Sequence, residues 1–499
     1  MRVLKRVVGS ACLCLGTVLS VSALASPAIY NAVRIGALGG SASFGVAINS
    51  VGEAVGWSWT AGATVPHAWR AVGTQTTDLG TFGGIGSFAY GINDFGDVVG
   101  QVNTAGTTFH AFVLSSGTFS DLNPAGAASS TALGINNFGQ IAGDYVDAGG
   151  VRHPVLYSGG IAELGSLGGN AGQAWSVNNA AQATGFSNDA TGGQRAFRHA
   201  GTTMVNLGTL GGSVSNGLDI NANGDVVGFS TTSGPNGARA FIHTGGQMLD
   251  LGTLGGATSS AQSINDAGQI VGQAATAAGE SSAFLYTEGV MFDLNTLVVS
   301  GLNGARLTYG VAINNKGQIV AQACPTATTC QTFRLDPTAP AGKVRAVEYY
   351  HAAFDHYFLT TIEDEITKLD NGTFVGWTRT GAGIDMDIGA PAGTVPVCRF
   401  FSAAFAPKSS HFYTPFASEC ATVKQDPVWT FEGEVFSVTL PDPTSACPVG
   451  RVPVYRLYNN GQSGAPNHRY TTSLNLRATM IARGWVPEGL APLGVLMCA

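Results

Sequence analysis

A repeat of about forty-three residues constrains the fold of this chain more than any other feature of its sequence. Each copy carries an Ile-Asn or Val-Asn pair that is followed by a turn. The pairs are Ile48-Asn49, Ile92-Asn93, Ile135-Asn136, Val177-Asn178, Ile220-Asn221, Ile264-Asn265 and Ile313-Asn314. Seven units of this length match the period of four-stranded propeller blades. The sequence therefore predicts a mainly β fold, with a seven-bladed β-propeller over residues 26–335.

The four strands of one unit can be placed in the copy that contains Ile92. We expect strands at residues 87–93, 97–101, 110–114 and 119–122. The glycine-rich Leu-Gly-x-Leu-Gly-Gly segment is expected to connect one unit to the next. The last unit lacks a fourth strand, and residues 32–35 form a lone apolar strand before the first unit. We predict that residues 32–35 pair with residues 331–335 and close the ring, which removes exposed sheet edges; an open solenoid is the alternative.

The N-terminal residues have the pattern of a secretory leader. Arg2, Lys5 and Arg6 precede an apolar run, which ends in Ala23 and Ala25. We therefore predict a signal peptide over residues 1–25 and a secreted protein, extracellular or periplasmic; an uncleaved membrane anchor is the alternative. No later stretch is long and apolar enough to span a bilayer. The net charge is −7, which argues against a nucleic-acid partner.

The cysteines indicate disulfides. Cys12 and Cys14 fall within the predicted leader, and six others follow it. An even number in an exported chain, without a C-x-x-C pair or matched histidine spacing, favours disulfides over a zinc site. Fifteen pairings are possible in principle. Proximity in the sequence predicts the pairs Cys324–Cys330, Cys398–Cys420 and Cys447–Cys498.

A change of composition marks a second domain. Residues 336–343 have the composition of a linker, and aromatic residues are dense beyond it. Three units within residues 344–499 share a His-aromatic segment that ends in Thr, then a short helix and a Trp. The segments begin at His356, His411 and His468. We expect a smaller α+β domain with pseudo-threefold, trefoil-like packing, in which each Thr caps the helix that follows.

Aromatic and charged side chains of these units are the candidate binding residues. Exposed Trp and Tyr rings can stack on sugars, and Glu can supply oriented hydrogen bonds. The candidates are His356, Tyr357, His411, Tyr413, Trp429, Glu432, His468, Tyr470, Trp485 and Glu488. The alternative is that these Trp and Tyr rings form the core. The first unit has Arg379-Thr380-Gly381 where the others have Glu-Gly, so a binding role for this Glu is in doubt in the first unit.

The sequence does not favour a metal site. The three histidines would bind zinc only if they converged on the pseudo-threefold axis, and we expect no metal or other cofactor. His67, His110 and His153 hold equivalent positions in three repeats, and we interpret them as strand-edge residues. The run at residues 93–97 superficially resembles a calcium loop without its terminal carboxylate, so turn chemistry is the better interpretation.

Two resemblances rest on these motifs. The repeats resemble HAF repeats of a bacterial extracellular family, on the segments at residues 251–256 and 264–268 and on His110-Ala111-Phe112. Residues 344–499 resemble a triplicated module of unknown function at the ends of secreted bacterial proteins, on the His-aromatic-Tyr-Thr, Trp and Glu-Gly features. The resemblances imply export and a repeat fold, and they bring no established activity.

The sequence offers no catalytic constellation. It contains no G-x-S-x-G, H-E-x-x-H or Walker motif. We therefore predict a secreted, non-enzymatic recognition or scaffold protein that binds a glycan or a cell-envelope protein. One alternative is an extracellular polysaccharide-acting enzyme with its site on irregular propeller loops, and the other is a passive structural matrix component. The oligomeric state does not follow from the sequence.

Overall fold

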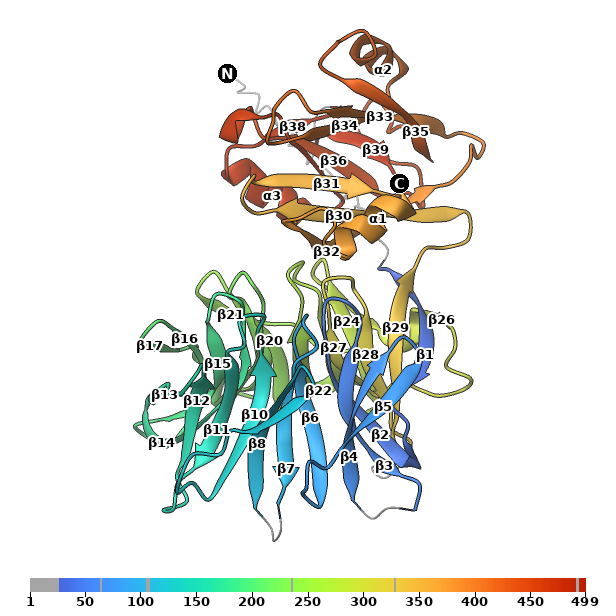
Figure 1. Cartoon of the computed structure of the whole chain (residues 1–499). Coiled ribbons are helices and arrows are strands. Elements are labelled where there is room, and N and C mark those ends of the chain that lie inside the picture. The colour runs from blue at the N-terminus through green and yellow to red at the C-terminus, as the bar shows by residue number, and fades with distance from the viewer. Residues whose placement is uncertain (1–26, 63–64, 105–107, 235–236, 327–328, 491–492) are drawn as a thin grey trace, which may run out of the picture.

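Two bodies make up the chain, which is described by a computed structural model over residues 27–62, 65–104, 108–234, 237–326, 329–490 and 493–499. In Figure 1 the blue to yellow strands form one body, and the orange and red elements form a second body at one end of it. The predicted leader, with Cys12 and Cys14, lies outside the described residues. None of the helices in the described part is long and apolar enough to cross a membrane.

The first body consists of seven sheets within the described residues, here called the seven-sheet array. Six of the sheets have four antiparallel strands in sequence order. They are β2 (Gly39–Ile48), β3 (Ala54–Thr60), β4 (Pro66–Val72) and β5 (Gln75–Gly80); β6 (Gly86–Ile92), β7 (Val98–Asn103), β8 (Phe109–Ser115) and β9 (Thr118–Asp121); β10 (Ser129–Ile135), β11 (Ile141–Val146), β12 (Arg152–Tyr157) and β13 (Ile161–Glu163); β14 (Gly168–Val177), β15 (Ala183–Asp189), β16 (Gln194–Ala200) and β17 (Thr203–Asn206); β18 (Gly211–Ile220), β19 (Val226–Thr232), β20 (Ala238–Thr244) and β21 (Gln247–Asp250); and β22 (Gly255–Ile264), β23 (Ile270–Thr276), β24 (Ser281–Thr287) and β25 (Val290–Asp293).

The seventh sheet joins the two ends of the array. It contains β27 (Tyr309–Ile313), β28 (Ile319–Ala323), β29 (Gln331–Thr338), β1 (Ile29–Ile35) and β26 (Val298–Ser300), and the short helix η1 (Leu294–Thr296) precedes β26. Ala32 pairs with Leu335 and Ile35 pairs with Thr332 in an antiparallel register. The expected pairing of residues 32–35 with residues 331–335 is therefore present, and the parallel strand β26 on the far side of β1 was not expected.

The first part of each glycine-rich segment connects two sheets as predicted, as residues 207–210 do between β17 and β18, but the glycine pair at its end does not. The strands β14, β18 and β22 begin at Gly168, Gly211 and Gly255, so these glycines belong to strands rather than to connections. Each of the three has a φ of +98° to +103°, which side chains with a Cβ disfavour. A Cβ on the next glycine, such as Gly212, would overlap the backbone of the neighbouring strand at Thr231. The glycine pair therefore permits close approach of two strands.

A ring of asparagines joins all seven sheets. Its members are Asn49, Asn93, Asn136, Asn178, Asn221, Asn265 and Asn314, and all are buried. Each Nδ2 donates to the backbone oxygen of the next asparagine at 2.9–3.3 Å, and Asn314 donates to Asn49, which closes the ring. Each Oδ1 accepts the backbone N–H four residues later at 2.8–3.0 Å, which fixes the turn. The turn interpretation of residues 93–97 agrees with these bonds.

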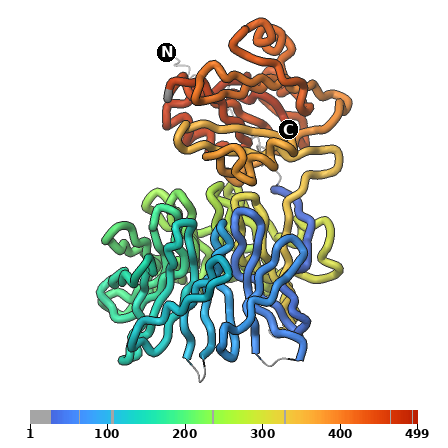
Figure 2. The backbone as a smooth tube through the Cα atoms, in the orientation of Figure 1, coloured from blue at the N-terminus to red at the C-terminus, as the bar shows by residue number. Residues whose placement is uncertain are grey.

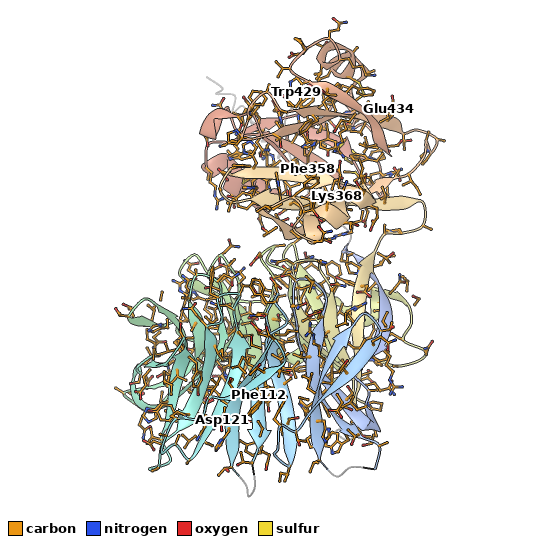
Figure 3. All side chains as sticks on the ribbon, viewed as in Figure 1. Phe112, Asp121, Phe358, Lys368, Trp429 and Glu434 are labelled. Carbon is orange, nitrogen blue, oxygen red and sulfur yellow. A yellow bond between two sulfur atoms is a disulfide. The ribbon has the colours of Figure 1, made fainter. Side chains whose placement is uncertain are left out.

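Aromatic side chains fill the spaces between adjacent sheets. Phe112, Phe197, Phe241 and Phe284 are fully buried and occupy the same place in the third strand of their sheets. Trp69 takes this place in the first sheet. Burial of one such side chain contributes about 1.5–3 kcal/mol. Phe112, labelled in Figure 3, lies in the strands of the array. The third residue of each His-Ala-Phe-like triplet is therefore a core residue.

The second body, here called the C-terminal domain, repeats one order of elements three times. The first unit is β30 (Lys343–His351), β31 (His356–Thr360), α1 (Glu363–Asp370) and β32 (Trp377–Asp387). The second is β33 (Val395–Ser402), β34 (Ser410–Thr414), α2 (Ala417–Val423) and β35 (Thr430–Val438). The third is β36 (Pro453–Tyr458), η2 (Gln462–Gly464), β37 (His468–Thr471), α3 (Leu474–Ala482), β38 (Val486–Glu488) and β39 (Val495–Cys498). The first two units share a six-stranded sheet, and the third forms its own sheet.

The linker is shorter than predicted. Strand β29 continues to Thr338 and β30 starts at Lys343, so only residues 339–342 lie between them. In Figure 2 the yellow to orange tube passes here from the seven-sheet array to the C-terminal domain. Pro337 is tolerated in the strand because β28 pairs with β29 only as far as Leu335, so no partner on that side needs its missing N–H. The predicted linker at residues 336–343 is therefore wrong at both ends.

The Thr that the three units share does not cap its helix directly. Thr360, Thr414 and Thr471 accept the backbone N–H two residues later, at 3.0–3.1 Å. That N–H belongs to the N-cap residue itself, and only Ser473 of the three N-cap residues caps with its own side chain. The predicted capping role of the Thr is therefore wrong, and the Thr instead fixes the turn that leads into each helix.

The three predicted disulfides are present. Cys324 and Cys330 join the ends of β28 and β29, Cys398 joins β33 to α2, and Cys498 ties the last strand to Cys447. Disulfides of this kind are typical of proteins that fold in an oxidising compartment.

Candidate binding site

The strand register of the C-terminal domain shows which residues are equivalent in the three units. In each unit the first two strands pair as a hairpin. On the first strand, the equivalent residues are Glu348, Arg399 and Arg456. On the second strand, one set of equivalent residues is Phe358, Phe412 and Arg469. The residues just before them, Tyr357, His411 and His468, form another set.

This register corrects one sequence-based equivalence. His411 pairs with Phe401, and His468 pairs with Tyr458, at the same place in their hairpins. Tyr357 holds this place in the first unit, and His356 lies one residue earlier. The side chain of His356 is buried, and its Nδ1 lies 2.7 Å from the backbone oxygen of Phe354. His356 is therefore not the counterpart of the other two histidines.

Ion pairs form where one unit meets the next. Arg399 of the second unit lies over the Phe358 ring of the first, 5.4 Å from its centre, and binds Glu365 and Glu432. In the same way Arg456 of the third unit lies over Phe412, 4.8 Å from its centre. Its partners are Glu419, at 3.2 Å, and Glu488, at 2.8 Å. Two of the three interfaces thus repeat one arrangement of Arg, Phe and two Glu side chains.

The third interface reverses the charges. Glu348 stands in the place of the arginines, and Arg469 stands in the place of the phenylalanines and binds it at 2.8 Å. Thr380 donates to Glu348 at 2.8 Å and holds the place of Glu432 and Glu488. A glutamate at 380 would oppose Glu348, and such like-charge contacts are unfavourable. The departure of the first unit from Glu-Gly therefore follows from this reversal.

Several candidate residues lie in the core. Tyr413 and Tyr470 are 2% and 4% exposed, and Trp485 is 5% exposed. The Tyr470 hydroxyl accepts the Tyr413 N–H at 2.9 Å, and the Tyr413 hydroxyl donates to the Leu359 carbonyl. The Tyr357 ring lies under the guanidinium of Arg469, 3.9 Å away. These tyrosines and Trp485 are occupied by contacts within the domain, which agrees with the core alternative for them.

Three other candidates, Trp429, His468 and Glu488, line a cavity between the second and third units, here called the Trp429 pocket. It has a volume of about 380 Å³ and is lined by Phe405, Phe412, Val423, Asp426, Val428, Trp429, Tyr458, Pro466, His468 and Glu488. Trp429, Phe405 and Tyr458 are half-buried, so their rings have accessible surface. Figure 3 labels Trp429 in the part of the C-terminal domain away from the array. His411 and Glu432 lie at the equivalent place between the first and second units.

The polar side chains of the Trp429 pocket have defined charges. Burial lowers the pKa of His468, so its ring is neutral near pH 7. Burial opposes ionisation of Glu488, but the contact with His468 and the charge of Arg456 outweigh it and lower the pKa of Glu488. Nε2 of His468 lies 3.4 Å from Glu488, and its buried Nδ1 has no hydrogen-bond partner among the described residues. With Nε2 protonated, the acceptors among these lining side chains are the carboxylates of Glu488 and Asp426, because Nδ1 of His468 is buried.

The equivalent acid at the other interface behaves differently. Burial raises the pKa of Glu432 despite the charge of Arg399, and burial together with Arg399 lowers the pKa of His411 well below its usual range. The pKa of the carboxyl group is therefore shifted in opposite directions in the two equivalent Glu-His pairs.

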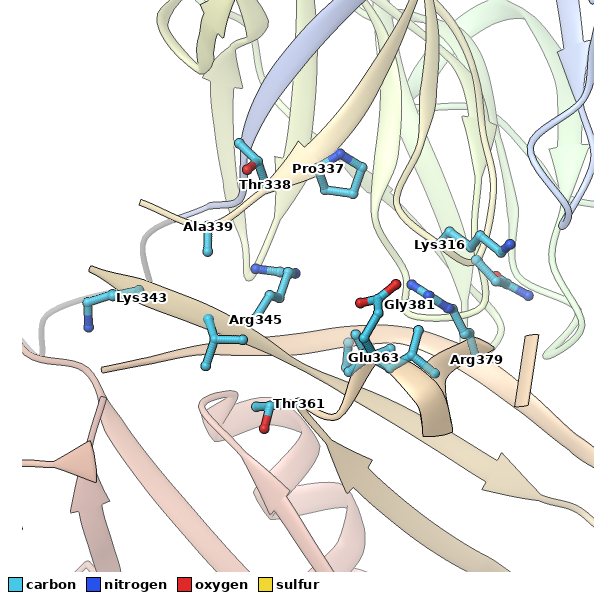
Figure 4. Close-up of a pocket in the computed structure, with 15 residues that line it drawn as sticks. Lys316, Pro337, Thr338, Ala339, Lys343, Arg345, Thr361, Glu363, Arg379 and Gly381 are labelled. Atoms are coloured by element: carbon cyan, nitrogen blue, oxygen red, sulfur yellow. The ribbon is translucent and has the colours of Figure 1, made fainter. Parts of the chain in front are cut away.

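A second cavity lies between the two bodies. It has a volume of about 370 Å³, and Figure 4 shows Lys316, Arg345, Arg379 and Glu363 around it. Asp370 binds both Lys316, at 3.4 Å, and Arg379, at 2.8 Å, while Arg345 binds Asp385 at 3.0 Å. These cations already have carboxylate partners, so the cavity is explained by the contact between the two bodies.

Three histidines of the array are also paired with carboxylates. His67 and His110 bind Asp78 and Asp121 on the neighbouring outer strand, at 2.9 and 2.8 Å, and both are partly exposed. His153 binds Asp147 at 3.1 Å. Across the described residues, no group of three His, Cys, Asp or Glu side chains is arranged to hold a metal ion. The three histidines each lie beside strand-edge carboxylates, in agreement with their sequence-based interpretation.

Two acids of the array, the buried Asp144 and the half-buried Asp219, escaped the sequence analysis. Asp144 is 1% exposed, and it contacts Gln173 of the next sheet at 2.6 Å and Arg152 at 2.9 Å. Asp219 accepts hydrogen bonds from Ser176 and Ser263, one on each adjacent sheet, at 2.8 Å. Both stand at repeat positions where the other units have uncharged residues, and that irregularity was the available signal.

Sequence reasoning also missed part of the Trp429 pocket. Phe405 and Pro466 lie in loops outside the shared motif, and Arg456 and Tyr458 belong to the motif but were not singled out. The substitution of Arg by Glu348 in one unit was the signal for the Arg positions, because a charge reversal within a repeat implies a partner elsewhere.

Comparisons with known proteins give one family match. Residues 345–495 match a family described as a domain of unknown function (DUF5648). No curated protein matches the chain. Solved structures that match part of the chain include a protein assigned as a gluconolactonase, at 12% identity and a TM-score of 0.26, over 46% of this chain and 81% of that one. They also include an arginine-to-alanine triple mutant of AofleA from Arthrobotrys oligospora, at 10% identity and a TM-score of 0.31, over 53% and 86%.

A third solved structure is a puromycin-hydrolyzing peptidase of Mycobacterium tuberculosis, at 12% identity and a TM-score of 0.24, over 52% of this chain and 54% of that one. These identities and scores are too low to transfer an activity to this chain. What the comparisons identify is the C-terminal domain, which over nearly its whole length is similar to the domain of unknown function (DUF5648).

Proposed function

We propose that this chain is an exported, non-enzymatic recognition protein that binds a neutral saccharide in the Trp429 pocket. In this proposal residues 26–335 are a seven-bladed β-propeller of HAF-type repeats, and the C-terminal domain is a pseudo-threefold, trefoil-like module that the propeller presents. The three disulfides support folding in an oxidising compartment. The closed asparagine ring supports the propeller.

The composition of the Trp429 pocket carries the proposal. Half-buried rings of Trp429, Phe405 and Tyr458 lie in one cavity with two carboxylate acceptors, Glu488 and Asp426. A pyranose ring has an apolar C–H face that packs on aromatic rings, and hydroxyl groups that donate to such acceptors. The volume of about 380 Å³ falls within the range of small-ligand sites.

The charges of the pocket favour neutral or amino sugars over acidic ones. Asp426 and Glu488 both line it, and Arg456, which contacts Glu488, is also bound to Glu419. A uronic acid would therefore bring a third carboxylate to a site without a free cation among its lining residues. Glu488 is held by Arg456 and His468, an arrangement suited to accepting hydrogen bonds.

Calorimetric titration of the full chain with cellotetraose and with the tetramer of N-acetylglucosamine tests the proposal. Both sugars present flat apolar faces. We expect at least one of them to bind, and we expect Trp429→Ala to weaken that binding by about tenfold or more. Trp377→Ala is the matched control, because Trp377 is the same residue in the first unit and lies outside the pocket.

Two results would contradict the proposal. One is the absence of heat with either tetramer, and the other is an equal loss of binding in the Trp377 and Trp429 variants. Thermal unfolding of both variants, compared with the parent chain, shows that a loss of binding is not a loss of fold.

A further inference from the structure

Two of the aromatic residues that line the Trp429 pocket, Phe405 and Trp429, have counterparts in the first unit, but there the space between the two rings is filled. Phe354 and Trp377 are the counterparts of Phe405 and Trp429. His351 lies between them, stacked on Phe354 with ring centres 3.8 Å apart and edge-on to Trp377 at 5.3 Å. Its side chain is buried. The first unit therefore carries a histidine ring where the second unit has a cavity.

The residue at the position of His351 in the second unit is small. Ser402 ends the first strand of its unit as His351 ends that of the first unit, and each pairs with the first residue of the adjoining strand. Ser402 is 1% exposed, and its hydroxyl accepts the Ala404 N–H at 3.3 Å, so it does not reach between Phe405 and Trp429. A serine leaves the space between the two rings open.

A second position changes together with this one. In the first unit the residue before the Trp is Gly376, with a φ of +88°, and a Cβ there would overlap the His351 ring. In the second unit this residue is Val428, which lines the Trp429 pocket. The histidine and the glycine thus form a matched pair, and the second unit has neither.

The interface between the third and first units is also filled. Gly484 precedes Trp485, and a Cβ on Gly484 would overlap Gln462, whose side chain donates to the Gly484 carbonyl at 3.4 Å. Arg469 and Tyr357 occupy the places of the Phe and His side chains of the pocket, and Trp485 is 5% exposed. Only one interface of the described domain therefore has the open arrangement.

We infer that Ser402 and Val428 keep the second–third interface open, that His351 with Gly376 closes the equivalent first–second site, and that the domain therefore binds one saccharide. This inference rests on the proposed saccharide binding. It identifies His351 and Ser402 as the residues that decide which interface accepts the sugar. The other polar residues needed for binding, His411 and Glu432, are already present at the closed interface.

Titration of His351→Ser with the tetramer that binds the parent chain tests the inference. We expect the stoichiometry to rise from one sugar to two, because Trp377 and Phe354 become accessible. The original Trp429 pocket in the same molecule is an internal control for folding, since its affinity is expected to stay unchanged. A stoichiometry of one in a folded variant that keeps its original affinity overturns the inference.

The reciprocal change closes the open site. The double variant Ser402→His with Val428→Gly transfers the matched pair to the second unit, and we expect it to weaken binding by about tenfold or more. Adding His351→Ser to this double variant is expected to restore a single site, now dependent on Trp377, which also shows that the domain folds. Unweakened binding in the double variant overturns the inference. If the parent chain binds neither tetramer, the proposed function itself fails.

Discussion

The seven-sheet array and the C-terminal domain are both built from repeats, but they close in different ways. In the array the same residue makes the joint in every copy, and Asn314 donates to Asn49 with the bond that joins all other neighbours. In the C-terminal domain the ion pair between neighbouring units is not the same at every interface. Two interfaces place an Arg on the first strand, and the third places Glu348 there and pairs it with Arg469. Identity between copies thus marks a structural joint, and a difference between copies marks a site that has been individually adapted.

The largest expected effect comes from the reversed ion pair. Arg469→Met leaves the Glu348 carboxylate, which is 2% exposed, without its cation. We expect a loss of about 3–5 kcal/mol in the stability of the C-terminal domain, because an uncompensated buried charge is costly. Scanning calorimetry measures this change, and the double variant with Glu348→Met is expected to recover most of it. Similar losses in the single and double variants would show that the charge reversal is not what joins the third unit to the first.

The next effect tests whether the asparagine ring is the joint of the array. Asn221→Leu removes its donor to Asn265 and the acceptor for two backbone N–H groups. We expect a loss of about 2–4 kcal/mol from the unsatisfied buried groups, seen as a lower unfolding midpoint of the array. Asn223→Ala is the matched control, since Asn223 is exposed in the same turn. If both variants lose the same stability, the ring is a consequence of the fold and not its joint.

A smaller effect depends on pH. Burial raises the pKa of Asp144 from 3.8 to about 6, although Arg152 and Gln173 oppose the shift. The folded state then binds this proton more tightly than the unfolded state, so the stability it contributes is complete below pH 3.8 and is lost as the pH rises through 6. Asp144→Asn imitates the protonated form and lacks this dependence.

The expected difference is therefore larger at pH 7 than at pH 4. We expect the free energy of unfolding of Asp144→Asn, relative to that of the parent chain, to be about 1–3 kcal/mol higher at pH 7 than at pH 4. Chemical denaturation at both pH values measures it, with Gln101→Asn, at the equivalent position of the second sheet, as a variant without a titrating group. A constant difference between Asp144→Asn and the parent chain would contradict the shift.

The smallest effect concerns the strand-edge histidines. His110→Ala breaks a partly exposed pair with Asp121, whose side chain is 48% exposed. We expect a change in stability below about 1 kcal/mol, because exposed ion pairs contribute little. An unfolding midpoint that falls as far as in Asn221→Leu would show that these positions hold the sheets together and are not merely edge residues.

Much of the array could be predicted because its signal is local and repeated. The strands β6 to β9 lie within two residues of their predicted bounds, and the role of residues 32–35 followed from one missing strand in the last unit. The asparagine turns were predicted as turns, because Asn favours them through its own side chain. That each Nδ2 also crosses to the next sheet was not predictable, since neighbouring asparagines lie more than forty residues apart in the sequence.

The candidate site was predicted only in outline. The motif led to Trp429, His468 and Glu488, which do line one pocket. It also led to Tyr413 and Tyr470, which are buried, because an aromatic motif does not reveal which face of a strand is covered. The register of the first unit was displaced by one residue at His356, and only backbone pairing with the neighbouring strand corrected it.

By itself the sequence determined the repeat period, the predominance of strands, the disulfide pairs and the unit in which Thr380 replaces a Glu, because each of these depends on residues near one another or on comparison of copies within the chain. The tertiary structure alone decided which copies are joined to which, and which of three similar interfaces stays open. Those outcomes depend on side chains brought together from different units, such as His351 between Phe354 and Trp377 or Arg469 against Glu348, and the volume left between packed side chains is set by their arrangement in space.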